Sequence, residues 1–445
     1  MASATLHHES SRKEERKVLA GTLVGTTIEW YDFFIYAQAA GLVLGPLFFA
    51  PLGETGAQLA SWASIGISFL FRPLGAIVAG HLGDRLGRKK MLVFTLIMMG
   101  AATALIGVLP THAQIGAGAA VMLILLRVLQ GFSAGGEWGG AALMSVEHAP
   151  VEKRGFFGAY PQIGVPCGMI LATFTMWILT TIIGNEAFLE WGWRVPFLFS
   201  IVLIGIGYFI RRAVEESPIF LELQERKKES SAPLGRLFKK NAKEVMLCAL
   251  IFIANNAAGY LLIAFFATYV IRDLGMPRPQ VLLATTLASF GWLIFTMYGG
   301  ILSDRIGRIR TFQIGYAIVA AWAIPMWFVL DTGNIIAYFI ALFVLTIGLG
   351  LSYGPQSALY AEMFPVDVRY SGVSIGYALG AILGGAFAPL IAESLLTRTG
   401  QSWSIGVYIL AITIVSLVAV SFVKETRGKN LHVEDVHPVP RASAD

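Results

Sequence analysis

Apolar stretches long enough to cross a lipid bilayer follow one another along almost the whole chain. A hydrocarbon core of about 30 Å is crossed by roughly 20 residues of α-helix. The sequence offers twelve such stretches, at residues 18–46, 58–80, 91–109, 118–145, 155–181, 195–213, 243–271, 280–302, 311–330, 335–359, 371–396 and 402–423. The pattern therefore predicts an all-α membrane protein with twelve transmembrane helices.

The composition agrees with this prediction. Of the 445 residues, 56% are hydrophobic and 14% are charged, whereas soluble domains carry roughly 25% charged residues. The two cysteines, Cys167 and Cys248, lie inside apolar segments, so we expect no disulfide framework. The polar start leads directly into a first span that is too long for the hydrophobic part of a signal peptide. We therefore expect no cleavable signal.

The basic residues are distributed unevenly between the polar connections. With the N-terminus placed in the cytoplasm, the cytoplasmic segments hold 27 of the 33 lysines and arginines, and the other side holds four. Cytoplasmic loops of membrane proteins carry such an excess of positive charge. The distribution predicts a multi-pass protein of the cell inner membrane with both termini in the cytoplasm.

Two charged motifs indicate that the chain is built from a duplicated half. The string at Gly80–Lys90 (GHLGDRLGRKK) returns at Gly300–Arg310 (GILSDRIGRIR), 220 positions later. A second motif, in which an arginine follows an acidic residue after seven positions, starts at Glu147 and again at Glu362. One duplication explains both pairs, so we expect two pseudo-symmetric six-helix bundles.

These observations also predict the domain boundaries. The only long cytoplasmic connection lies between the two repeats and is rich in charge. The predicted units are a cytoplasmic N-terminal tail (1–17), an N-terminal six-helix bundle (18–213), a cytoplasmic linker (214–242), a C-terminal six-helix bundle (243–423) and a cytoplasmic C-terminal tail (424–445).

Ionisable residues inside the predicted spans are concentrated in the first half. Such residues are costly in a bilayer and usually face a partner or a water-filled path. They are Glu29, Asp32, Arg72, Arg127 and Glu137. In the second half neutral polar groups occupy the spans instead, namely Asn255, Asn256, Tyr260, Tyr353 and Gln356.

The count of these charges predicts a proton-coupled protein. Three acids against two bases leave one carboxylate without a partner, and burial without a countercharge favours the protonated form. Asp32, Glu29 and Glu137 are the candidate proton carriers. Because glycines surround Glu137 and permit close helix contact, a packing role is the alternative for that residue.

The position of Arg127 leaves two interpretations open. Asp32 lies about 21 Å along its helix from residue 18, and Arg127 lies at a comparable depth, so the two side chains can meet if the first and fourth helices adjoin. Arg127 is then either a permanent ion-pair partner that fixes helix packing or an anchor for a substrate carboxylate, released when Asp32 takes a proton. We interpret Arg72, beside Pro73, as a structural partner of an acid in the first half.

Four strings give the chain a resemblance to a known family. They are Glu29–Phe33 (EWYDF), Phe69–Gly75 (FLFRPLG), Gly135–Gly140 (GGEWGG) and Trp191–Phe197 (WGWRVPF). With the two halves, they make the chain similar to the metabolite:proton symporters of the major facilitator superfamily over all but its tails. Within that family the chain looks most like shikimate permeases and related organic-acid carriers.

The resemblance implies a mechanism and a set of contacts. The two halves are expected to rock about a site near the bilayer midplane, with the first and fourth helices adjoining. In the outward-open state Asp84 is expected against the start of the eleventh helix, around Ser371 and Gly372, and Asp304 against the start of the fifth, around Gly155. The conformational latch predicted in this way comprises Asp84, Arg85, Arg88, Asp304, Arg305, Arg308, Arg154 and Arg369.

The expected function is proton symport that imports a small organic acid, such as a shikimate-like monocarboxylate or a dicarboxylate. The candidate substrate-binding residues are Arg127, Gln130, Trp138, Tyr160, Gln162, Asn255, Asn256, Tyr260, Tyr353 and Gln356. Three alternatives stay open at this point. They are symport of a zwitterionic osmolyte of the proline or betaine type, proton-coupled drug efflux, and a non-transporting sensor with the same fold.

The sequence also predicts several absences. It contains no Walker loop, no cluster with metal-ligand spacing and no nucleophile arrangement, so we expect no enzyme activity, no metal and no cofactor other than the proton as coupling ion. The expected partners are a small organic acid, protons and the lipid bilayer, with no nucleic acid. The protein is expected to be a monomer.

Overall fold

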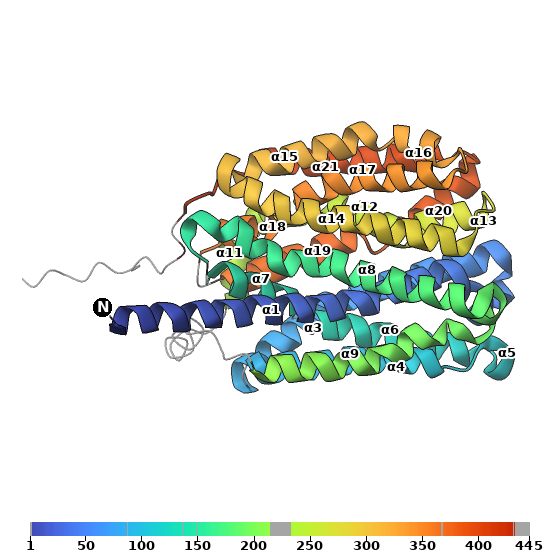
Figure 1. Ribbon diagram of the computed structural model, residues 1–445, viewed down its shortest axis with the longest axis horizontal. Helices are drawn as coiled ribbons and strands as arrows, with labels where there is room; N and C mark the ends of the chain where they lie inside the picture. Colours follow the sequence, from blue (N-terminus) through green and yellow to red (C-terminus); the bar gives the residue numbers. More distant parts are fainter. Residues whose placement is uncertain are drawn as a thin grey trace, which may run out of the picture.

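The computed structural model describes residues 2–86, 88–135, 137–147, 149–213, 233–365, 368–429 and 431, without the side chains of residues 2–15, 18, 79–92, 211–213 and 233–236. Over these ranges the chain consists of helices and their connections. The helices lie side by side along one common direction and form an elongated bundle (Figure 1). This is the arrangement that satisfies every backbone hydrogen bond within lipid.

The first half contributes six helical passes. They are α1 (Ala2–Ala39), which continues through a π-helical turn at Ala40–Leu44 into α2 (Gly45–Phe48); α3 (Gly53–Leu86); α4 (Arg88–Val108); α6 (Gly118–Ala134) followed by α7 (Glu137–Glu147); α8 (Arg154–Ala187); and α9 (Arg194–Ala213). A short helix, α5 (His112–Ile115), connects α4 to α6.

The second half contributes six more. They are α12 (Ala242–Tyr260), which continues through a π-helical turn at Leu261–Phe265 into α13 (Phe266–Arg272); α14 (Arg278–Ile306); α15 (Arg308–Trp322) with α16 (Pro325–Leu330); α17 (Ile335–Tyr353) with α18 (Gln356–Met363); α19 (Arg369–Gly384) with α20 (Ala388–Thr399); and α21 (Trp403–Ser421). The short helix α11 (Pro233–Lys240) precedes them.

The twelve predicted spans are present as helical passes within the described residues. Nine are long and apolar enough to cross a bilayer, and α4 and α9 are shorter apolar helices. The remaining pass is interrupted between α15 and α16, where Pro325 begins the second helix, because proline cannot donate the backbone hydrogen bond that a continuous helix needs.

Two helix ends differ from the prediction. Helix α1 begins at Ala2 rather than at residue 18, so the expected N-terminal tail is the first part of a helix that projects beyond its neighbours (Figure 1). Element α8 extends to Ala187, six residues beyond the predicted end of the fifth span, with a break at Gly184, whose backbone is not helical (φ 80°, ψ 166°). Hydropathy marks the depth of the bilayer, whereas a helix continues into water as long as its backbone hydrogen bonds do.

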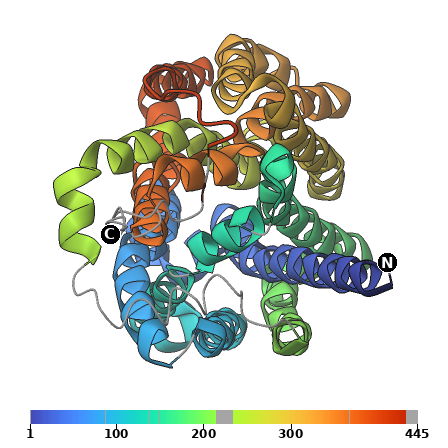
Figure 2. The same ribbon diagram turned by 90° about the vertical axis from the view of Figure 1, so that its left-hand side faces the viewer.

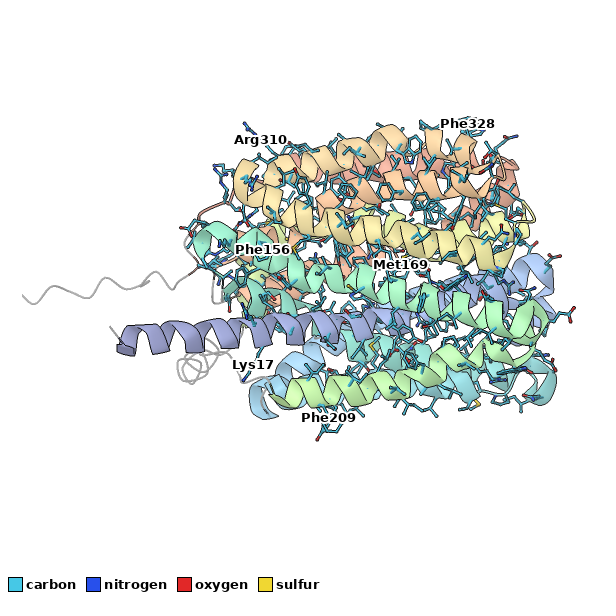
Figure 3. All side chains as sticks on the ribbon, viewed as in Figure 1. Lys17, Phe156, Met169, Phe209, Arg310 and Phe328 are labelled. Carbon is cyan, nitrogen blue, oxygen red and sulfur yellow. The ribbon has the colours of Figure 1, made fainter. Side chains whose placement is uncertain are left out.

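The outer surface of the bundle is apolar. Phe209 and Phe328 are 70% and 62% exposed and point outward at opposite edges (Figure 3). Ile182 on α8 and Phe422 after α21 are exposed to a similar degree. Side chains of this kind on the outside of a helical bundle are suited to contact with lipid tails rather than with water.

The two halves meet closely at one end of the bundle, where α8 begins and α14 ends. A Cβ atom added to Gly155 would lie 2.4 Å from the carbonyl oxygen of Gly300, and one added to Gly300 would lie 2.6 Å from that of Gly155. Only glycine at both positions lets the two backbones approach in this way. We refer to this end, seen face-on in Figure 2, as the ion-paired end.

The halves also touch at the opposite end. There a Cβ atom added to Gly41 of the first half would lie 2.1 Å from Thr268 Oγ1 of the second. Nearby, the rings of Trp62 and Phe265 lie 6.2 Å apart. Contacts between the halves therefore bound the centre of the molecule on both sides.

Candidate functional site

At the ion-paired end a carboxylate of the second half binds the start of a helix of the first half. Asp304 accepts hydrogen bonds from the backbone N–H groups of Gly155 (2.8 Å) and Phe156 (2.9 Å). Phe156 lies at this end of the bundle in Figure 3. The unpaired amides and the dipole at a helix start favour a negative charge. The contact predicted between Asp304 and the start of the fifth span is thus present.

Ion pairs surround this contact. Arg308 donates to Asp304 (2.6 Å) and pairs with Glu362 (3.2 Å), and both side chains of the second pair are fully buried. Two further pairs join the halves, one between Arg154 and Glu362 (4.0 Å) and one between Arg369 and Glu147 (3.2 Å). Arg305, in contrast, is exposed. The side chains of Asp84, Arg85 and Arg88, predicted as the symmetric half of the latch, lie outside the described residues.

The segment after α21 crosses the ion-paired end, where it appears as the dark red loop of Figure 2. Glu425 accepts hydrogen bonds from the first two backbone N–H groups of α15 (2.9 and 3.1 Å). Further along, the carbonyl of Lys429 accepts from Arg154 (2.5 Å), and that of Leu431 accepts from Arg369 (3.3 Å). We call residues Lys424–Leu431 the C-terminal strap, because the segment ties the second half to Arg154 of the first.

The strap gives a prediction about the stability of this end. A chain truncated after Lys424 loses these hydrogen bonds, whereas one truncated after Leu431 keeps them and is the matched control. We expect only the shorter chain to open more often at the ion-paired end. A cysteine in place of the fully buried Val146, in a background without the native cysteines, should then react several-fold faster with a thiol reagent. Equal rates in both chains would show that the strap does not hold this end together.

Between this end and the centre, aromatic rings from both halves are stacked. Trp138 of α7 lies parallel to Tyr377 of α19 at 3.7 Å, and Tyr377 stacks on Phe252 at 4.4 Å. Gln162 accepts a hydrogen bond from Trp138 Nε1 (3.0 Å) and donates to the carbonyl oxygen of Tyr353 (3.2 Å). The stack and the glutamine bridge connect the two halves on the side of the centre that faces the ion-paired end.

At the centre lies Arg72, whose side chain is 3% exposed. Its Cζ lies 4.3 Å from the ring centroids of Phe33 and Phe69 and 5.5 Å from that of Trp30, distances at which a cation is attracted to aromatic faces. Arg72 Nε and Nη2 have no hydrogen-bond partner among the described residues. It also makes no ion pair with a described carboxylate, so the structural acid partner expected for it is absent from this part of the chain.

Groups of the second half face Arg72. The ring of Tyr260 lies 5.0 Å from that of Phe69 and 6.4 Å from that of Trp30. The hydroxyl of Tyr260 points toward the Arg72 guanidinium, and Tyr377 lies within electrostatic range of it. Glu29 also lies within electrostatic range of Tyr260. The centre thus combines a buried cation and a carboxylate of the first half with aromatic hydroxyls of the second.

Arg127, the cation singled out in the sequence, has a different environment. All three guanidinium nitrogens donate hydrogen bonds within the first half, to Gln130 Oε1 (2.6 Å), Ser68 Oγ (2.7 Å) and the carbonyl oxygens of Ser64 (3.2 Å) and Ile65 (3.3 Å). The expected ion pair with Asp32 is therefore wrong for the described structure. The backbone of α3 offers acceptors that the depth of a residue along its own helix does not reveal.

Asp32 belongs to α1 and faces α4 and α9. Ser200 Oγ donates a hydrogen bond of 2.6 Å to its carboxylate, and Thr103, whose hydroxyl donates to the carbonyl oxygen of Met99 (3.0 Å), lies close by. Thr103 in turn accepts from Gln130 Nε2 (2.7 Å), and Gln130 accepts from Arg127. Asp32 and Arg127 are therefore connected through two neutral side chains instead of by direct contact.

The other predicted residues differ in their surroundings. Asn256 and Gln356 are buried and carry side-chain atoms without a hydrogen-bond partner in the described part of the chain. Asn255 donates to Leu349 O and Ser352 Oγ within the second half, and Tyr160 packs edge-on against Phe156 near the start of α8. Glu137 is buried at the start of α7.

Sequence reasoning missed the position of Arg72 in the centre and those of Tyr377 and Phe252 in the stack next to it. Arg72 was visible as a charge inside a span, but its neighbour Pro73 favoured a structural interpretation. Phe252 and Tyr377 had no distinguishing signal, because an aromatic residue in an apolar span is usually part of the packing. Among the described residues no group of three or more His, Cys, Asp or Glu side chains could hold a metal ion.

Two helical bundles that touch at both ends around a buried polar centre form the architecture of a membrane transporter with alternating access. The chain belongs to the Major Facilitator Superfamily, whose family model matches residues 22–378. It is therefore a multi-pass transport protein and not an enzyme.

Relatives extend over nearly the whole chain. The inner membrane metabolite transport protein YhjE of Escherichia coli (strain K12) is 39% identical over 440 residues, which cover 96% of this chain and 99% of that protein. The shikimate transporter of the same organism is 35% identical over 430 residues (94% and 96%). The ectoine/proline transporter ProP of Corynebacterium glutamicum is 34% identical over 433 residues (94% and 86%).

A solved structure has the same fold. The crystal structure of a D-xylose-proton symporter superimposes with a TM-score of 0.73 at 19% sequence identity, covering 94% of this chain and all of that one. This similarity supports the arrangement of two six-helix halves.

Proposed function

We propose that the protein imports a small organic acid together with protons across the inner membrane by alternating access. The ion-paired end and both termini would face the cytoplasm, in keeping with the distribution of basic residues. Relatives named as metabolite and shikimate transporters support an organic solute, and a proton symporter of the same fold supports the coupling ion.

The environment of Arg72 is the observation that carries this proposal. A guanidinium buried between aromatic rings, with two nitrogens lacking partners in the described structure, is suited to bind an anion. Its planar N–H groups match a carboxylate in two parallel hydrogen bonds. Because Arg72 lies where the halves meet, an anion bound there would contact both. The substrate-binding role of Arg127 stays a prediction, with its donors occupied in this conformation.

The proposal assigns the proton to Asp32, which is separated from Arg72 by the body of α1. The Asp32 carboxylate accepts a hydrogen bond from Ser200 Oγ and forms no ion pair with a cation among the described residues. Gaining or losing a proton would change the hydrogen bonds along Thr103 and Gln130 and so affect Arg127. Glu29 and Glu137 remain the next candidates, and no cofactor other than the proton is proposed.

The experiment that tests this function is uptake into liposomes containing the purified protein. Under an imposed gradient with the interior alkaline, an organic acid such as succinate or quinate should accumulate against its concentration, and protein-free liposomes serve as the control. If the gradient drives no organic solute inward, the proposed function is wrong.

A zwitterionic substrate is the second candidate. Relatives are named as ectoine/proline and proline/betaine transporters, and Glu29 adds a carboxylate to the centre that would balance an ammonium group. Glycine betaine and proline therefore belong in the same uptake assay, where accumulation of betaine without that of any organic acid would favour this candidate.

The ion-paired end is proposed as the latch that opens when the protein faces inward, together with Asp84, Arg85 and Arg88. Asp304→Asn keeps the shape of the side chain and removes its charge. We expect a loss of about 1–2 kcal/mol from the closed state, which shifts the balance toward the open state about five- to thirty-fold. The buried cysteine at position 146 reports this shift through faster labelling. An unchanged labelling rate would show that the duplicated motif sets only the orientation of the chain in the membrane.

A further inference from the structure

The second half carries neutral polar atoms beside the central cation that have no hydrogen-bond partner in the described part of the chain. Besides the nitrogens of Arg72, the buried side-chain atoms without a hydrogen bond among the described residues include several of the second half, namely Asn256 Oδ1, Tyr260 OH, Trp292 Nε1, Gln356 Oε1 and Nε2, and Tyr377 OH. Each of these side chains is at most 5% exposed. Buried polar groups in native proteins are usually hydrogen-bonded, so a set of this kind around one cation indicates a ligand that completes it.

Several of these atoms lie close to one another. The hydroxyl of Tyr260 points toward Arg72, and that of Tyr377 approaches Tyr353, yet neither makes a hydrogen bond of ordinary geometry within the described structure. Tyr353 lies 6.3 Å from the ring of Trp292. Asn256 lies beside Tyr260. These residues therefore form a neutral wall opposite the guanidinium.

Gly385 shows that Asn256 is held in its place. A Cβ atom added to Gly385 would lie 2.0 Å from Asn256 Oδ1 and 2.9 Å from Tyr260 Cδ2. Any larger residue on α19 or the turn that follows it would displace both side chains. The close approach of the Gly385 backbone to Asn256 Oδ1 therefore gives the wall a defined shape.

We propose that the transported acid is a hydroxylated monocarboxylate, with its carboxylate on Arg72 and its hydroxyl groups on Asn256, Tyr260 and Tyr377. This inference rests on the proposed function and specifies its substrate. One anchoring cation matches one carboxylate. The hydroxyls of the substrate would donate to Asn256 Oδ1 and accept from the two tyrosines.

The same geometry disfavours the two other classes of substrate. A dicarboxylate needs a second cation at the centre, but Arg127 is engaged by its own half, and the other buried arginines of the described structure, Arg154, Arg308 and Arg369, pair with acids at the ion-paired end. A betaine needs free aromatic faces for its ammonium group. Those of Phe33 and Phe69 are already occupied by Arg72.

The test compares two acids that differ only in their hydroxyl groups. Quinate and cyclohexanecarboxylate share a ring and a carboxylate, and only quinate carries ring hydroxyls. Binding to the purified protein is measured by calorimetry, with succinate and glycine betaine as representatives of the other classes. We expect quinate to bind at least a hundredfold more tightly than cyclohexanecarboxylate, because a site built for hydroxyl groups rejects an analogue that leaves its polar atoms unpaired.

Variants then assign the hydroxyl contacts. Tyr377→Phe and Tyr260→Phe each remove one oxygen, and each should weaken quinate binding about tenfold while leaving that of cyclohexanecarboxylate unchanged. Tyr338→Phe is the matched control, because Tyr338 is equally buried but hydrogen-bonded to Thr285 at 2.7 Å away from the centre. It should leave both affinities unchanged, and thermal melting verifies that each variant is folded.

The possible results separate this inference from the proposed function. Tighter binding of succinate, betaine or cyclohexanecarboxylate than of quinate, no binding of quinate, or an equal effect of the tyrosine variants on both ring acids overturns the inference. Uptake of succinate or betaine driven by the pH gradient would then leave a proton-coupled importer standing. If the pH gradient drives uptake of none of these solutes, the proposed function itself is wrong.

Discussion

Glutamine in place of Arg72 is expected to weaken binding of the carried acid about 10- to 150-fold. That range is the effect of losing a hydrogen bond to a charged group, about 1.5–3 kcal/mol. Lysine at this position keeps the charge but loses the planar pair of donors, so it should restore only part of the affinity. Equilibrium binding of the acid to the purified variants measures both effects.

A matched control separates anion binding from general damage. Arg194 donates to the carbonyl oxygens of Gly107 (3.1 Å) and Leu109 (2.6 Å), away from the centre, and Arg194→Gln should leave the affinity unchanged. Arg127→Lys decides between the two buried cations of the first half. If this variant loses affinity and Arg72→Lys does not, the anchor is Arg127, as the sequence alone suggested.

The second large effect is expected from Asp32→Asn. Asparagine cannot take up and release the proton, so uphill accumulation driven by a pH gradient should be abolished. Exchange of labelled for unlabelled acid needs no net proton movement and should continue at a similar rate. The measurement is a comparison of gradient-driven uptake with counterflow in the same liposomes.

Asp331 offers a control of similar chemistry. Its carboxylate accepts hydrogen bonds from the hydroxyls of Tyr269 (2.7 Å) and Ser402 (2.5 Å), as that of Asp32 does from Ser200, but it lies at the end of the bundle opposite the ion-paired end. Asp331→Asn should keep gradient-driven uptake. Accumulation that survives in Asp32→Asn would move the proton site elsewhere, with Glu29 and Glu137 to be examined next.

The fold could be predicted from the sequence because a bilayer imposes one physical requirement on every span. A helix must bury its backbone polar groups in its own hydrogen bonds and present about 20 apolar residues to the lipid. The break between α15 and α16 was not anticipated, although Pro325 was visible. An apolar segment keeps its hydropathy when its hydrogen bonds are interrupted, so hydropathy does not detect the interruption.

The contact of Asp304 with the start of α8 was predicted because the duplicated motif, together with the family resemblance, specified both partners. The C-terminal strap was missed because its contacts use backbone carbonyl oxygens, such as those of Lys429 and Leu431. These atoms are present in every sequence and carry no signal of their own. Only the path of the chain across the ion-paired end brings them to Arg154 and Arg369.

The central site was only partly predictable for a related reason. Spacing gives the depth of a side chain along its helix, and Arg127 and Asp32 are both buried within the first half. Spacing does not give the partners that a neighbouring helix offers. Ser68 and two backbone carbonyls of α3 engage Arg127, whereas aromatic rings surround Arg72, two of whose nitrogens have no partner among the residues that the structure describes.

The central claim is that an organic acid and protons enter together through one protein. Its most direct test records both fluxes in the same liposomes. Labelled quinate reports uptake of the acid, and a trapped pH indicator reports entry of protons. We predict that quinate entry acidifies the interior beyond the leak of protein-free liposomes, and that both signals are lost in Asp32→Asn. Quinate entry at the same rate with and without a pH gradient, and with no acidification, would contradict the account.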